Sequence, residues 1–141
     1  MSAKTITRGA ILRSELKVLI ICENKESGKY AKELGDHLLL SLQSKIEITP
    51  DVWTFAALQH PQLQESAAEK INEADIILFS TSGNASLPAT IKRWLEACLA
   101  QSERPRALAV LFGPAADSQE VRSTRHYLEE IASKRALDFF V

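Results

Sequence analysis

Residues 74–96, ADIILFSTSGNASLPATIKRWLE, constrain the fold of this chain more than any other stretch. A continuous apolar run, residues 76–79, ends at a cluster of small polar residues and glycine, residues 80–86. A helical pattern follows at once with Pro88 near its first position, where proline fits because the first helical amides have no partners. A buried strand, a polar loop and a helix make half of a parallel β-α-β unit. The stretch therefore predicts an α/β protein whose ligand site lies beyond the carboxyl ends of parallel strands.

The rest of the chain repeats this alternation of strand and helix. Four further apolar runs have the composition of strands buried in a parallel sheet. Pro50 lies inside the second run and cannot donate to a sheet ladder, so we expect that run at an edge or at a strand end. The expected strands are residues 17–22, 46–55, 76–79, 107–112 and 137–141.

Apolar residues at helical spacing fill the intervals between these strands. His60-Pro61 opens the second expected helix and Pro88 the third. Asp117, with Glu120 three residues later, resembles a capping box and is expected to begin the fourth. The first expected helix carries an apolar face of Tyr30, Leu34, Leu38 and Leu42.

Five strands alternating with four helices predict one domain over residues 1–141, with residues 1–16 as an N-terminal extension. We expect a three-layer αβα sandwich with a five-stranded parallel sheet in the order 2-1-3-4-5. No helix follows the last expected strand, so one sheet face keeps one helix of the usual two. Either the N-terminal segment, with Ile6, Ile11, Leu12 and Leu16, or a second copy of the chain is expected to cover the face under strands four and five.

Composition excludes several function classes. The net charge of −1 and the pI of about 6.3 give no basic surface for nucleic acid or for anionic lipid. No apolar run is long enough to span a membrane, and the N-terminus has no signal-peptide core. Cys22 and Cys98 lie far apart and suggest neither a disulfide framework nor a zinc site. These features predict a cytoplasmic protein.

The residues from 74 to 99 resemble those of one superfamily. Ala74-Asp75, Phe79-Ser80-Thr81, Leu87-Pro88-Ala89 and the helix around Lys92 follow a pattern of the third strand and its helix in flavodoxin-like proteins. Within that superfamily, the stretch is most similar to the NAD(P)H-dependent FMN reductases and quinone reductases. The motif match spans this one unit, whereas the order of elements fits from about Lys17 to Val141.

The resemblance implies an FMN site built from three loops at the carboxyl edge of the sheet. In the first loop, hydroxyls and amides at a helix N-terminus would hold the phosphate, although Glu23 and Glu26 would repel it. The second loop would lie along the flavin ring, but it lacks the aromatic residue that family members often place there. The implied FMN-binding residues are Asn24, Ser27, Gly28 and Lys29 in the first loop, Ser80, Thr81, Ser82, Gly83 and Asn84 in the second, and Gly113 and Pro114 in the third.

Each of these loops also has a purely structural interpretation. The charged first loop suits a solvated turn, and Ser86 in the second suits a helix cap. Gly113-Pro114 suits a strand-ending turn. Trp53 and Phe55 follow the second strand, where a bound ring would be near, but burial beneath the helix layer is the simpler expectation, and Trp94 is expected in the core.

Two functions remain open from the sequence. The first is an FMN-binding protein, an NAD(P)H-dependent FMN or quinone reductase or an electron carrier, that passes hydride or electrons to a small-molecule acceptor. No side chain stands out as a catalytic acid or base. The second is a degenerate flavodoxin-like domain without flavin that acts as a homodimer or as a partner-binding module. The acidic first loop, the second loop without aromatics and the uncovered sheet face favour the second.

Other chemistries find less support. Cys22 ends the first strand, where low-molecular-weight phosphatases keep a nucleophile, but the arginine that they need six residues later is Gly28 here. Acidic neighbours would also raise the pKa of the thiol, so a buried structural cysteine is expected. His37, His60 and His126 belong to separate helices, and their spacing predicts no metal site.

Overall fold

The computed structural model describes residues 15–42, 47–82, 87–102, 105, 107–112 and 118–140. Within these ranges, strands and helices alternate along the whole chain, as the sequence predicts. The strands are β1 (Glu15–Cys22), β2 (Glu47–Thr54), β3 (Ile76–Thr81), β4 (Ala107–Phe112) and β5 (Asp138–Phe140). The helices are α2 (Lys25–Leu42), α3 (Pro61–Glu73), α4 (Ala89–Gln101) and α5 (Gln119–Lys134), with a 3-10 turn η1 (Ala57–Gln59) before α3.

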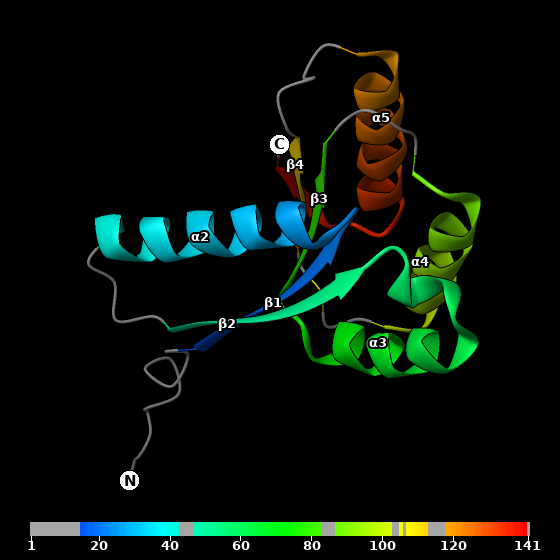
Figure 1. Cartoon of the computed structure of the whole chain (residues 1–141). Helices are drawn as coiled ribbons and strands as arrows, with labels where there is room; N and C mark the ends of the chain where they lie inside the picture. The colour runs from blue at the N-terminus through cyan, green and yellow to red at the C-terminus, as the bar shows by residue number, and fades with distance from the viewer. Residues whose placement is uncertain are drawn as a thin grey trace, which may run out of the picture.

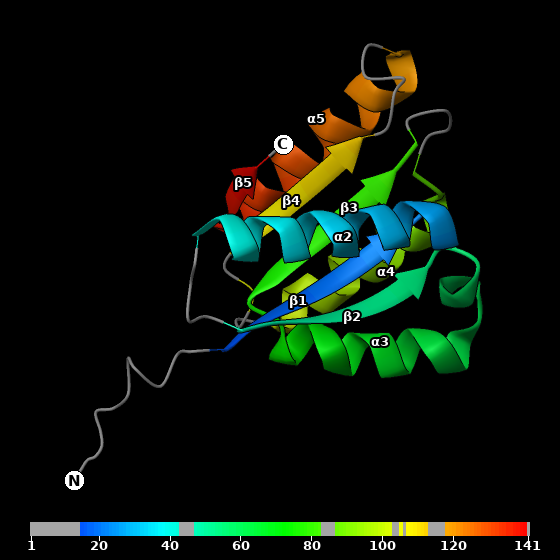
Figure 2. The same cartoon turned by 60° about the vertical axis from the view of Figure 1, so that its left-hand side comes forward.

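The five strands form one sheet in the order β2-β1-β3-β4-β5, and all four neighbouring pairs are parallel. Figures 1 and 2 show the strands side by side with their carboxyl ends at one edge. The predicted α/β class, the parallel sheet and the order 2-1-3-4-5 are confirmed. This topology is flavodoxin-like.

Several element boundaries differ from those expected. β1 begins at Glu15, so the last two residues of the expected N-terminal extension belong to the sheet. The N-cap of α5 is Ser118, not Asp117, because the Ser118 Oγ accepts the Val121 amide at 3.1 Å. α4 begins at Ala89 with Pro88 at its N-cap, whereas Ser86, the expected cap, lies outside the described residues.

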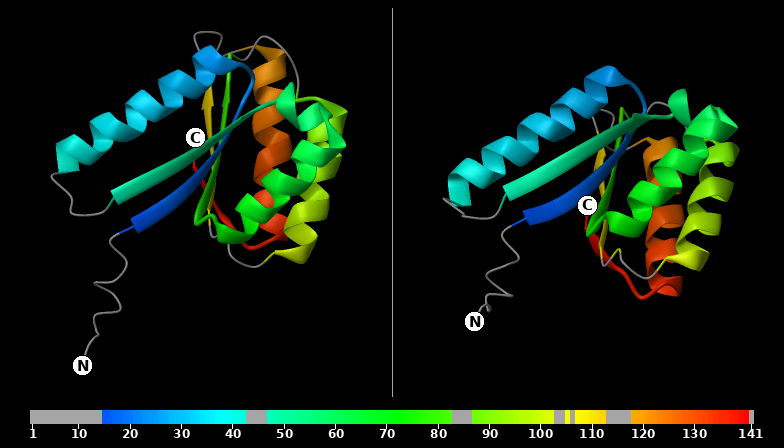
Figure 3. Two further views of the ribbon diagram at one scale, coloured as in Figure 1. Left: turned by 60° about the horizontal axis from the view of Figure 1, so that its bottom comes forward. Right: turned by 90° about the horizontal axis from the view of Figure 1, so that it is seen from below.

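One face of the sheet is covered by α3, α4 and α5, which Figure 3 shows together on one side. Side chains from alternate strand positions, such as Ile21, Phe79 and Leu108, are fully buried there. Trp94 from α4 joins this main core, as predicted, and its Nε1 donates to the Gln64 carbonyl at 3.0 Å. The hydrophobic burial that stabilises the domain is concentrated on this face.

The opposite face is covered unevenly. Among the described helices, α2 alone lies on this side, where it contacts β1, β2 and β3. The register joins Ile20, Leu78, Ala109 and Phe140 in one row across the sheet. Ile20 is 2% exposed beneath α2, Leu78 and Ala109 are half-buried, and Phe140 at the edge is 57% exposed.

We call the less covered part of this side the open face; it consists of Ile76, Leu78, Ala109, Leu111 and Phe140, of which Leu78 and Leu111 also pack against the buried cluster beneath α2. Its apolar side chains are partly exposed although each belongs to a strand of the sheet. The structure thus confirms that this face has one helix, α2, among the described elements. The N-terminal residues expected to cover it, including Ile6, Ile11 and Leu12, lie outside the described residues.

Candidate functional site

The carboxyl edge of the sheet has a hollow at the topological switch point. β1 and β3 are neighbours there, but the chain leaves β1 through α2 on one face and leaves β3 through α4 on the other. Loops that diverge in this way leave a crevice in which α/β proteins bind ligands. The hollow has a volume of about 610 Å³ and is lined by Asn24, Glu26, Ser27, Tyr30, Ser80, Thr81, Ser82 and Phe112.

Five of the sequence-predicted site residues meet in this switch-point hollow: Asn24, Ser27, Ser80, Thr81 and Ser82. They come from two loops more than fifty residues apart in the chain. Four others, Gly83, Asn84, Gly113 and Pro114, lie outside the described residues. The first and second loops, which the resemblance implies would share one site, thus lie side by side at the carboxyl edge of the sheet.

Gly28 and Lys29 do not line the switch-point hollow. Both line a second hollow of about 440 Å³ on the other flank of α2, above β2, together with Lys25 and Lys32. A Cβ atom at Gly28 would lie 2.8 Å from the Cys22 Sγ and 3.1 Å from the Val52 Cγ1. The absence of a side chain at Gly28 thus lets α2 approach the sheet closely, and a role in phosphate binding is not needed to explain it.

The first loop satisfies its own polar groups. The Asn24 amide donates to the Ser27 Oγ at 3.1 Å, and the Ser27 amide donates to the Asn24 Oδ1 at 2.9 Å. The Ser27 hydroxyl in turn donates to the Asn24 carbonyl at 3.0 Å. This reciprocal arrangement caps the N-terminus of α2 in the manner of a capping box. A phosphate would have to displace these bonds to reach the same donors.

Glu23 joins the first loop to the second. Its carboxylate accepts the Ser82 amide at 2.9 Å and the Ser82 hydroxyl at 2.9 and 3.1 Å. The Glu23 amide donates to the Ser80 carbonyl at 2.9 Å, and the Ser80 hydroxyl donates to the Ser27 carbonyl at 2.8 Å. A carboxylate that accepts charge-assisted bonds from an amide and a hydroxyl fixes the two loops against each other.

The charges around the hollow do not suit FMN, the group that the fold suggests. The phosphate of FMN is an anion, and a site for it needs free amides and cations. Here, the acidic residue Glu26 is part of the lining, and the carboxylate of Glu23 accepts the Ser82 amide at the edge of the hollow. Lys29, the cation that the resemblance implies, and its neighbour Lys25 line the hollow on the far flank of α2. The described residues therefore do not fit a flavin phosphate.

Sequence reasoning missed the two aromatic residues of the site. Tyr30 was assigned to the buried face of the first helix, but its side chain is 54% exposed and lines the hollow. Phe112 ends β4 and lines the same hollow. The signal for Tyr30 was its position three residues after Ser27, which places both side chains on the same flank of a helix.

The cysteines are structural in this fold. Cys22 is fully buried, and desolvation raises the pKa of its thiol; the Sγ lies 3.5 Å from the Trp53 carbonyl. Burial also raises the pKa of Cys98, to about 11. Neither thiol has the lowered pKa of a nucleophile. Trp53 and Phe55 are half-buried and pack against the main core, in agreement with the expected burial beneath the helix layer.

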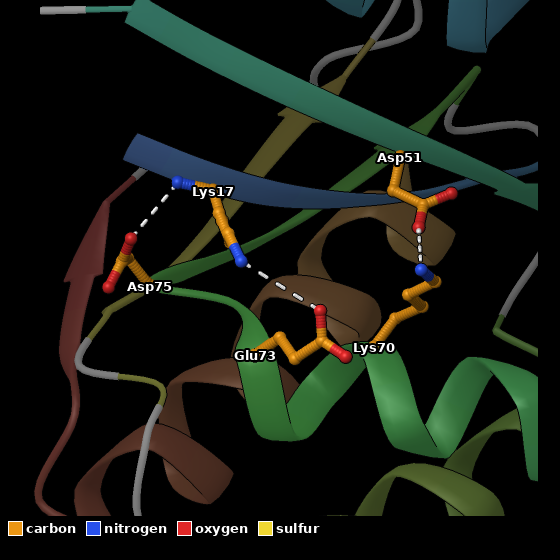
Figure 4. Close-up of polar contacts among 5 residues, drawn as sticks. All are labelled: Lys17, Asp51, Lys70, Glu73 and Asp75. Atoms are coloured by element: carbon orange, nitrogen blue, oxygen red, sulfur yellow. Dashed lines mark hydrogen bonds and ion pairs between the residues drawn. The ribbon is translucent and has the colours of Figure 1, made fainter. Parts of the chain in front are cut away.

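A second polar cluster lies at the opposite, amino edge of the sheet (Figure 4). Lys17 is 3.8 Å from Glu73, and Lys70 is 3.7 Å from Asp51. The Lys17 amide donates to the Asp75 Oδ2 at 3.0 Å, and the Asp75 amide donates to the Lys17 carbonyl at 2.8 Å. Because these charges pair with one another, the cluster ties α3 and the start of β3 to β1 and β2.

Other site classes find no support among the described residues. No group of three or more His, Cys, Asp or Glu side chains there has the arrangement to hold a metal ion. None of the described helices is both long and apolar enough to span a bilayer. His126 lies 3.5 Å from Glu130 on the surface of α5.

Comparison of the chain with protein-family models found no match, and comparison with curated protein sequences found none. The topology and the geometry of the switch-point hollow are therefore the basis for any functional proposal.

Proposed function

We propose that this chain is a flavodoxin-like domain that binds no flavin and acts as a partner-binding module. The observation that carries the proposal is the Glu23 carboxylate, which accepts both the amide and the hydroxyl of Ser82. These donors belong to the loop that would otherwise lie along a flavin ring. The Glu23 side chain thus bonds to the donors that a flavin would otherwise use.

To bind at this site, FMN would have to displace hydrogen bonds within and between the two loops. Separating Glu23 from Ser82 would leave a half-buried carboxylate without its donors, at a free-energy cost of about 1–3 kcal/mol. Opening the Asn24–Ser27 pair would add a further loss. The phosphate would then meet the carboxylates of Glu23 and Glu26 rather than cations. Both terms oppose FMN.

The same features suit recognition of a partner. Tyr30 and Phe112 give the hollow two aromatic walls, and aromatic side chains are enriched at protein interfaces. Leu111, on the open face, precedes Phe112 in β4, but the two side chains point to opposite faces of the sheet, and Phe112 packs against the main core. The acidic hollow and the apolar open face are thus two neighbouring surfaces that together suit an apolar and basic partner.

FMN binding, as in an NAD(P)H-dependent reductase, is the competing hypothesis. It is favoured by the five predicted residues that meet at the switch point, where this fold class binds ligands. It remains a prediction, and one experiment separates it from the proposal.

The experiment is an absorption spectrum of the purified protein, taken as isolated and again after incubation with FMN and removal of the excess. We expect a colourless protein in both cases. Riboflavin, which lacks the phosphate, serves as a second probe, because it separates rejection of the phosphate from rejection of the ring. Flavin absorption that co-elutes with the wild-type protein would contradict the proposal.

Charge variants sharpen this result. If electrostatic repulsion excludes FMN, Glu23→Gln and Glu26→Gln together should raise FMN affinity, and high salt should weaken the gain. Glu33→Gln is the matched control, since Glu33 lies on α2 but lines the hollow above β2.

A further inference from the structure

We infer that the open face is a binding surface for a basic, apolar segment and that its occupant is residues 1–14 of the same chain. The inference deepens the proposed function and rests on it in one respect, since it takes the open face as the recognition surface. The open face needs an occupant because partly exposed apolar strand positions are unusual in the middle of a parallel sheet.

The composition of the segment suits the open face. Residues 1–14, MSAKTITRGAILRS, contain Ile6, Ile11 and Leu12 among their apolar residues. These side chains match the chemistry of Leu78 and Phe140 on the open face, which are half-buried and exposed, respectively. Their burial against each other would remove both sets from water.

The segment carries a charge opposite to that of the carboxylates near the open face. Residues 1–14 carry Lys4, Arg8 and Arg13 and no acidic residue. Carboxylates lie toward both ends of the strands of the open face, and at the amino end Lys134 and Arg135 line the same hollow as Asp138. Asp138 is exposed and pairs in register with Ala107 at the amino end of β4, and Glu26 lines the hollow at the carboxyl end. A basic segment laid along these strands would place positive charge near both.

Residues 1–14 are long enough to extend from β1 to β5. The described chain begins at Glu15, at the amino end of β1, and Figure 2 shows the other strands beginning at the same edge. β5 lies three strands from β1, about 14 Å away at the usual spacing. Fourteen residues span up to about 46 Å when extended, so the segment can cross the open face from its point of attachment.

Tethering favours this segment over a second copy of the chain. A short linker gives an effective concentration of about millimolar, well above the concentration of a second copy in dilute solution. The segment therefore takes the position on this face that a second helix has in the expected three-layer sandwich.

A double-mutant cycle in the full chain tests the inference. One change is the segment variant Ile6→Ser/Ile11→Ser/Leu12→Ser, and the other is Phe140→Ser on the open face. Leu63→Ser is the matched control, because Leu63 is an exposed leucine, 37% accessible, on α3 across the sheet. The readout is the urea midpoint of each variant.

We expect the segment variant to lower the urea midpoint. The shift caused by Phe140→Ser should be at least halved in that background, whereas the shift caused by Leu63→Ser should be the same in both backgrounds. An undiminished Phe140→Ser shift would overturn the inference. Phe140 is exposed, so its replacement leaves a folded protein to measure.

Light scattering after size-exclusion chromatography distinguishes the occupants. We expect the mass of one chain at every concentration tested. A concentration-dependent dimer that the segment variant abolishes would mean that the segment of a second copy occupies the face, and the intrachain inference would fail. These results do not depend on flavin: FMN binding would contradict the proposed function and leave the cycle unchanged.

A direct measurement uses a spin label at Ala10→Cys in a Cys98→Ser background. Docking on the open face should broaden the amide signals of Tyr30, Leu111 and Phe140 and spare those of α3. Equal broadening on both sides of the sheet would overturn the inference.

Discussion

The two faces of the sheet are formed by the same strands but differ in how fully they are buried. On β4, Leu108 and Val110 are fully buried beneath the three-helix layer, whereas Ala109 and Leu111, one residue away from them, are half-buried on the open face. The strand is equally apolar on both sides. The difference teaches that strand composition reports the capacity of a face to be covered, while the connecting helices decide whether it is covered.

The sharpest test of this comparison is a pair of leucines on β4. Leu108→Ala should lower the free energy of unfolding by about 3 kcal/mol, because it opens a cavity in the main core. Leu111→Ala should cost about 1 kcal/mol, because the described residues leave its side chain only half-buried. Urea denaturation measures both. Equal losses would show that the open face is buried as fully as its opposite, and the contrast between the faces would fail.

The next effect concerns how α2 lies on its own side of the sheet. Gly28→Ala should destabilise the domain by about 2 kcal/mol, because the new Cβ would lie 2.8 Å from the Cys22 Sγ and overlap it. The loss should shrink in a Cys22→Ala background, which provides the missing space. Chemical denaturation of the four proteins completes the cycle. If the loss is unchanged in that background, close contact between α2 and β1 does not explain the glycine.

The smallest effect tests a polar contact within the three-helix layer. The Tyr127 hydroxyl donates to the Glu96 carboxylate at 2.6 Å and lies 3.2 Å from the Lys92 carbonyl. Tyr127→Phe should therefore cost about 1 kcal/mol at neutral pH. Tyr30→Phe, on the exposed flank of α2, is the control and should change stability little.

The cost of Tyr127→Phe should depend on pH. Burial, and then the hydrogen bond and the negative charge of Glu96, raise the pKa of Tyr127 above its usual value near 10. The folded protein thus holds this proton more tightly than the unfolded chain. The stability that Tyr127 contributes is fully present below about pH 10 and falls as the pH rises further. A cost that grows above pH 10 would contradict this assignment.

Much of the fold could be predicted from local patterns. The expected strand 107–112 agrees with β4, and the helix expected at His60-Pro61 is α3. Short apolar runs and proline positions act over a few residues, so the sequence contains them directly. The resemblance to flavodoxin-like proteins implied that the loops of Ser27 and Ser80 share one edge, and the Ser80 hydroxyl does donate to the Ser27 carbonyl.

The closure of the site could not be predicted in the same way. Glu23 was expected only to repel a phosphate, and its bonds to Ser82 depend on side-chain geometry between residues 59 positions apart. Gly28 was expected to bind phosphate, and its close approach to Cys22 on the neighbouring strand was not foreseen. Neither contact leaves a periodic or compositional signal, since each is fixed by how the packed elements meet.

The two edges of the sheet determine how molecules of this kind can assemble. β2 forms one edge and contains Pro50, which lacks an amide hydrogen, and β5 forms the other, where the structure describes three strand residues, Asp138–Phe140. Strands that are interrupted or short are poor templates for adding a strand from another chain. Continuous sheets across subunits, and the fibrous aggregates that grow by the same route, are therefore disfavoured. Any specific contact of this domain is directed to its broad faces, where side chains rather than backbone groups determine which partner fits.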